Sequence, residues 1–107
     1  MFVVDTGAIT VITQRLMDKY KLSSEDKLRS QNPAGAGGSI VIAAYWMDSM
    51  RIGDLDVPLE QIGVTDLNAV SEKLFNATGR LIDGLIGQDV LLAIHAIIDV
   101  SNQHLYL

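Results

Sequence analysis

The chain has 107 residues, enough for one domain with a modest hydrophobic core. Apolar residues make up 49% of it and charged residues 20%, a balance typical of a folded globular protein. The net charge of -5 provides no basic patch for nucleic acid, the absence of cysteine excludes disulfides and thiolate metal sites, and no apolar run reaches the length of a membrane span. We therefore expect a single domain over 1–107 without a nucleic-acid partner or a membrane-spanning segment.

The first expected element is a buried strand that ends abruptly in a polar turn. Three apolar residues at 2–4 are followed by Asp5, Thr6 and Gly7. A carboxylate at the end of a buried strand needs partners or a chemical role, because burying an unpaired charge is costly. The backbone freedom of Gly7 lets its amide turn toward the Asp5 carboxylate. The stretch predicts either a site built around Asp5 or an ordinary turn of the same composition.

Further along the chain, apolar spacing predicts a mixture of strands and short helices. Thr13 is expected to cap a helix that has Leu16, Met17 and Tyr20 on one face, and a second helix is expected to begin after Asp66 and to end at Gly79. The other expected elements are strands over 9–12, 40–46 and 57–64, a short helix over 89–94, and a closing hairpin formed by 95–100 and 103–107.

The glycine-rich stretch at 34–39 has three interpretations. A phosphate-binding loop requires a helix directly after the glycines, whereas the apolar run at 40–46 predicts a strand. A glycine-rich tip between two strands is a mobile hairpin, because each glycine adds backbone freedom. Such a hairpin either closes over a ligand or is a surface loop without one, and the residues alone leave both readings open.

A second apolar-glycine pattern, Leu85-Ile86-Gly87, follows far downstream. Asp-Thr-Gly-Ala at 5–8, the glycine-rich tip at 34–39 and this pattern occur in the order found in retropepsin-like (retroviral-type) aspartic proteases. The endings Gly-Gln-Asp-Val-Leu-Leu, Ile-Ile-Asp-Val and His-Leu-Tyr-Leu are similar to those of the single-domain bacterial and cellular branch. Nearly the whole chain therefore resembles that family.

The resemblance implies a mainly β fold, a closed β-barrel or sandwich like one half of an acid protease, with two or three short helices and a flap hairpin. It implies that the catalytic residues are Asp5, Thr6 and Gly7. It implies that substrate is bound by Ala8 and by the flap residues Ala34, Gly35, Ala36, Gly37 and Gly38. It implies that the catalytic loop is supported by Leu85, Ile86 and Gly87. No metal or other cofactor is implied.

Aspartic proteolysis needs two carboxylates that share a proton, and the sequence has a single Asp-Thr-Gly. We therefore expect a homodimer with one Asp5 from each subunit, acting as an endopeptidase on peptide or protein substrates. The alternative is a catalytically silent domain that dimerises or binds peptides. It is favoured by Ile9 and Gln88, which stand where retroviral members have an acid and a basic residue, and by the apparent lack of the N-terminal strand or hairpin that precedes the catalytic strand.

The remaining candidates have simpler explanations. His95 and His104 have no acid or cysteine at ligand spacing and are expected to be ordinary histidines. Ser39 has no partners for a serine triad. Asp83 and Asp89 are expected to be a loop residue and a helix cap. For location, the periplasm or another extracytoplasmic compartment of a bacterium is favoured over the cytoplasm.

Overall fold

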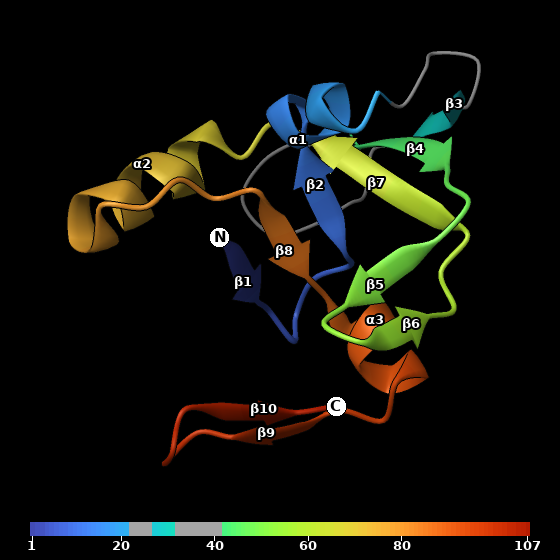
Figure 1. Ribbon diagram of the computed structural model, residues 1–107. Coiled ribbons are helices and arrows are strands. Elements are labelled where there is room, and N and C mark those ends of the chain that lie inside the picture. Colours follow the sequence, from blue (N-terminus) through green and yellow to red (C-terminus); the bar gives the residue numbers. More distant parts are fainter. Residues whose placement is uncertain (22–26, 32–41) are drawn as a thin grey trace.

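The computed structural model describes residues 1–21, 27–31 and 42–107. In chain order its elements are β1 (Phe2–Val4), β2 (Val11–Thr13), α1 (Gln14–Lys19), β3 (Lys27–Gln31), β4 (Ile42–Trp46), β5 (Met50–Ile52), β6 (Leu55–Val57), β7 (Gln61–Thr65), α2 (Asn68–Thr78), β8 (Gly84–Ile86), α3 (Gln88–Ala93), β9 (Ile97–Asp99) and β10 (His104–Tyr106) (Figure 1). The expected flap at 34–39 lies outside the described residues.

The main sheet has six strands in the order β1-β8-β2-β7-β4-β3. β8 lies between β1 and β2, parallel to the former and antiparallel to the latter, so that Leu85 is opposite both Val3 and Val11 (Figure 1). β2 runs parallel to β7, and β4 is antiparallel to both β7 and β3. The loop from β1 to β2 must therefore pass around the end of β8, and this loop contains the Asp-Thr-Gly sequence.

The mainly β fold agrees with the sequence prediction, but the expectation of a closed barrel is wrong. The described strands form one open sheet with β1 and β3 at its edges, and the pairs β5–β6 and β9–β10 are separate two-stranded sheets. Closure requires the two edge strands to pair with each other. Among the residues that the structure describes, β1 pairs only with β8 and β3 only with β4.

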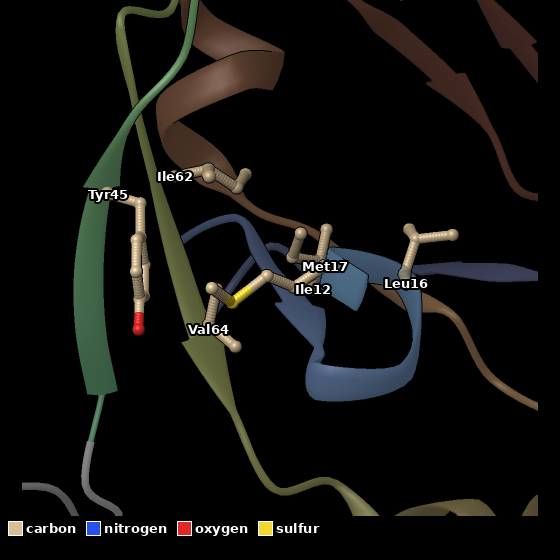
Figure 2. Close-up of a cluster of buried hydrophobic side chains, with 6 residues drawn as sticks. All are labelled: Ile12, Leu16, Met17, Tyr45, Ile62 and Val64. Carbon is tan, nitrogen blue, oxygen red and sulfur yellow. The ribbon is translucent and has the colours of Figure 1, made fainter. Parts of the chain in front are cut away.

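The core covers both faces of the sheet because successive residues of a strand point to opposite sides. Ile12 belongs to a buried cluster with Leu16, Met17, Tyr45, Ile62 and Val64 (Figure 2). Its neighbour Val11 belongs to a second cluster, with Ile42, Leu67 and Ile82. A third cluster packs α3 against the end of β8 and contains Val57, Ile86, Val90 and Leu91.

Some helix predictions hold and others fail. Thr13 caps α1 by accepting a hydrogen bond from the Leu16 amide, and Gly79 ends α2 with a φ of 70°. Tyr20, however, is exposed, because α1 ends at Lys19 and the expected apolar face is cut short. The expected strand over 57–64 is two strands, β6 and β7, since Pro58 falls between them and cannot donate a backbone hydrogen bond.

Candidate active site

Asp5 stands directly after β1, at the open edge of the main sheet. Its backbone amide donates to the carbonyl oxygen of Ile86 at 3.0 Å, which continues the pairing of β1 with β8. The Gly7 amide donates to Asp5 Oδ1 at 2.9 Å, the hydrogen bond that the tight turn was expected to provide. Asp5, Thr6 and Gly7 are all exposed. The Gly7 amide therefore holds the Asp5 carboxylate in place within the turn, and the carboxylate remains accessible to a molecule that binds at this edge of the sheet.

The loop that holds Asp5 rests on the segment between β8 and α3. The Gln88 amide donates to the carbonyl oxygen of Ala8 at 2.8 Å. A side chain at position 87 would place its Cβ 2.4 Å from that same oxygen and 2.3 Å from the carbonyl carbon of Ile9. Only glycine permits so close an approach of two backbones. Leu85 packs on the second core cluster and Ile86 belongs to the third, so the segment beneath the loop is itself held from both faces.

Two further residues tie the loop to α3, and the sequence analysis did not assign them to the site. Thr10 is 2% exposed, and its Oγ accepts a hydrogen bond from the Gly87 amide at 2.9 Å. Both the Thr10 amide and its hydroxyl donate to Asp89 Oδ1, at 2.9 and 2.7 Å. The prediction that Asp89 caps α3 is wrong. The cap residue is Gly87, which has no side chain to accept a hydrogen bond. A polar residue three positions after Gly7, inside an apolar run, was the signal available in the sequence.

The other candidate residues lie elsewhere. Asp83 pairs with Arg15 and with the amine of Met1, and the hydrogen bond from that amine, together with the nearby positive charge of Arg15, lowers the Asp83 pKa. His95 and His104 are exposed. Within the described residues, no three histidine, aspartate or glutamate side chains gather as metal ligands would.

The described surface contains hollows of about 470 and 790 Å³, and neither is lined by a residue of the loop 5–10. The smaller lies between α1 and the start of α2, and the larger lies between the main sheet and the segment 47–53. In the part of the chain that the structure describes, no helix is long and apolar enough to cross a bilayer.

The family model described as aspartyl protease matches residues 1–90, which include the Asp5 loop and the β8–α3 segment beneath it. The chain belongs to the aspartyl protease family. The match includes both halves of the site and ends within the first turn of α3. A search of curated proteins finds no match.

The fold has a solved counterpart. The crystal structure of the retroviral protease-like domain of Ddi1 from Leishmania major is similar to this chain with a TM-score of 0.65, over 99% of this chain and 76% of the Ddi1 chain. At 20% identity this likeness establishes the fold. The aspartyl protease membership and the retropepsin-like fold predicted from the sequence are thus confirmed.

Proposed function

We propose that this member of the family is an aspartic endopeptidase that acts as a homodimer. The observation that carries the proposal is the Asp5 carboxylate, held by the Gly7 amide on a loop fixed to the β8–α3 segment and exposed at the sheet edge. One such carboxylate per chain is half of what the reaction needs, so a second copy supplies the other.

The chemistry assigns opposite roles to the two Asp5 residues. The ionised one takes a proton from a water molecule, whose oxygen attacks the carbon of the scissile carbonyl. The protonated one gives its proton to the carbonyl oxygen, forming a tetrahedral diol. Transfer of a proton to the amide nitrogen then allows the carbon–nitrogen bond to break, releasing an acid and an amine. Ala8 and the glycine-rich segment at 34–39 are proposed to bind the peptide, and Thr6 and Gly7 to orient the dyad.

Apolar exposure supports a partner at the Asp5 edge. Val4 and Ile9, on either side of the catalytic turn, are 42% and 50% exposed. The β9–β10 hairpin extends from the body of the molecule (Figure 1), and Ile97, Val100 and Tyr106 on it are more than half exposed. A two-stranded hairpin is marginal by itself, and apolar patches of this kind mark protein interfaces. A second copy of the chain would cover both the apolar residues beside the catalytic turn and those on the hairpin.

The competing proposal is a silent domain of the same fold that dimerises or binds peptides without cutting. Its support is the absence of a charged pair at Ile9 and Gln88, where retroviral enzymes have one. Gln88 is exposed, and the contact of this residue with the loop is made by its backbone amide, so the loop is held without that pair.

The experiment is cleavage of a mixture of unfolded proteins, read by mass spectrometry, with Asp5→Asn beside the wild type. The change is nearly isosteric and removes the charge, so the variant should fold and should lose cleavage entirely. Asp56→Asn removes the charge of an exposed residue on β6 and should cleave as the wild type does. Activity per molecule should rise with concentration as dimers form. Cleavage that survives Asp5→Asn would exclude the mechanism, and a wild type that dimerises without cutting would favour the silent domain.

A further inference from the structure

The structure assigns to Thr10 and Asp89 the role of positioning residues for the catalytic carboxylate, an inference that rests on the proposed function. Neither touches the reacting atoms. They act through the loop 5–10, whose far end they fix to the first turn of α3. The loop would otherwise be held by backbone hydrogen bonds alone, from Asp5 to Ile86 and from Gln88 to Ala8.

The geometry at Thr10 requires a side chain that both donates and accepts. Its Oγ accepts from the Gly87 amide and at the same time donates to Asp89 Oδ1. A hydroxyl provides this combination, and a methyl group of the same size provides neither part of it. Because Thr10 is buried, its loss would leave the Gly87 amide without this acceptor.

Asp89 provides one oxygen that receives two hydrogen bonds, from the amide and the hydroxyl of Thr10. This pair of bonds fixes both the backbone and the side-chain rotamer of Thr10. Asp89 is in turn fixed by its place in α3, where the next two residues, Val90 and Leu91, are in the third core cluster. The position of Asp5 is thereby linked to the packing of α3 in the third core cluster.

A second Asp5 must approach to hydrogen-bond distance for the proposed reaction, so a small displacement of the loop has a large effect on rate. The displacement would alter the dyad more than the contacts of a long peptide with the rest of the protein. Loss of the Thr10–Asp89 contact should therefore lower kcat and leave KM nearly unchanged.

The test compares Thr10→Val, which is isosteric, with Thr10→Ser, which keeps the hydroxyl. Per folded molecule, kcat should fall at least about tenfold in Thr10→Val and stay within about threefold in Thr10→Ser. Asp89→Asn retains an acceptor oxygen and should behave like Thr10→Ser, whereas Asp89→Ala should behave like Thr10→Val. Asp89 is half-buried, so the alanine variant admits water and provides the comparison even if Thr10→Val does not fold.

Ile62→Ala is the control for stability alone, because Ile62 is buried in the first core cluster, which contains no residue of the loop 5–10. It should lower the melting temperature without changing kcat per folded molecule. Wild-type kcat in both Thr10→Val and Asp89→Ala would overturn the assignment, as would an equal loss in Asp89→Asn and Asp89→Ala. If the wild type cuts nothing, the proposed function fails, and amide exchange of Gly7 decides the positioning role instead: faster exchange in Asp89→Ala supports it, and unchanged exchange refutes it.

Discussion

Gly87 and Gly53 are glycines for different physical reasons, and their replacement by alanine should differ accordingly. A Cβ at position 87 would meet backbone atoms of Ala8 and Ile9 at 2.4 and 2.3 Å, whereas a Cβ at 53 meets nothing within 4 Å but has a φ of 59°. We expect Gly87→Ala to cost about 3 kcal/mol through overpacking and Gly53→Ala about 1 kcal/mol through backbone strain.

Urea denaturation of the two alanine variants measures the difference. Gly87→Ala should also lose any peptidase activity, because the Asp5 loop must move away from the new side chain. Gly53→Ala, in the β5–β6 turn, should retain it. Equal losses of stability in the two variants would show that the loop and the β8–α3 segment are not in close contact.

Asp83 should make the folding stability depend on pH. Its folded pKa is lowered by the hydrogen bond from the Met1 amine and by Arg15. A depressed folded pKa stabilises the native state above the unfolded value of about 4, and this contribution is lost as pH falls through the folded value. Asp83→Asn should therefore be less stable than the wild type at pH 7 and equally stable in strong acid. Asp54→Asn, an exposed control with the same charge change, should track the wild type at both; a constant gap for Asp83→Asn would contradict the ion pairs.

At the level of single residues, sequence patterns predicted local chemistry well and long-range partners poorly. The Gly7 amide on Asp5 and the Thr13 cap follow from residues within three positions of each other. The Asp89 bonds join positions 79 apart, and nothing in a local pattern distinguishes an acid in the first turn of a helix that caps it from one that accepts bonds from a distant strand. Family resemblance identified the segment beneath the loop without identifying that acceptor.

The same limit applies at the level of elements. The closing hairpin was predicted from the turn residues between its strands and is present as β9 and β10. The helix after Asp66 was predicted from apolar spacing and is present as α2, but it buries none of its residues completely, since spacing identifies an apolar stripe without showing how much covers it. The single strand expected over 57–64 failed because Pro58 was placed near the start of a strand and in fact separates two strands.

We expect substitutions in the β9–β10 hairpin to weaken dimerisation more than substitutions in any other element. Ile97 is 65% exposed on β9, so Ile97→Lys should leave the monomer folded and raise the dimer dissociation constant at least about tenfold, because a charge would be buried in the interface. Phe75→Lys is the matched control on α2, where Phe75 is 46% exposed. Sedimentation velocity over a range of concentrations measures both. A similar loss of association in the two variants would place the interface elsewhere.

For the whole molecule, the net charge and the arrangement of the proposed site both favour tighter association at lower pH. Each chain has a net charge of -5, so two copies repel one another at neutral pH. The proposed dimer also brings two Asp5 carboxylates together, because one chain supplies only one of the two that the reaction needs. Both effects weaken as protons are added, and a pH titration alone would not separate them.

Substitution at Asp5 separates them. Two adjacent carboxylates do not both ionise readily, and pairs in aspartic proteases retain one proton. Association that takes up a proton becomes tighter as pH falls, by at most about tenfold per pH unit for one proton. We therefore expect the wild-type dimer to weaken as pH rises from about 4, the ordinary carboxyl value, toward neutrality. Asp5→Asn removes the clash and should lose most of this slope, whereas Asp56→Asn, with the same change in net charge, should keep it. Sedimentation equilibrium of the three proteins across this range is the measurement, and equal slopes in all three would mean that general repulsion explains the effect and that the two Asp5 residues do not meet.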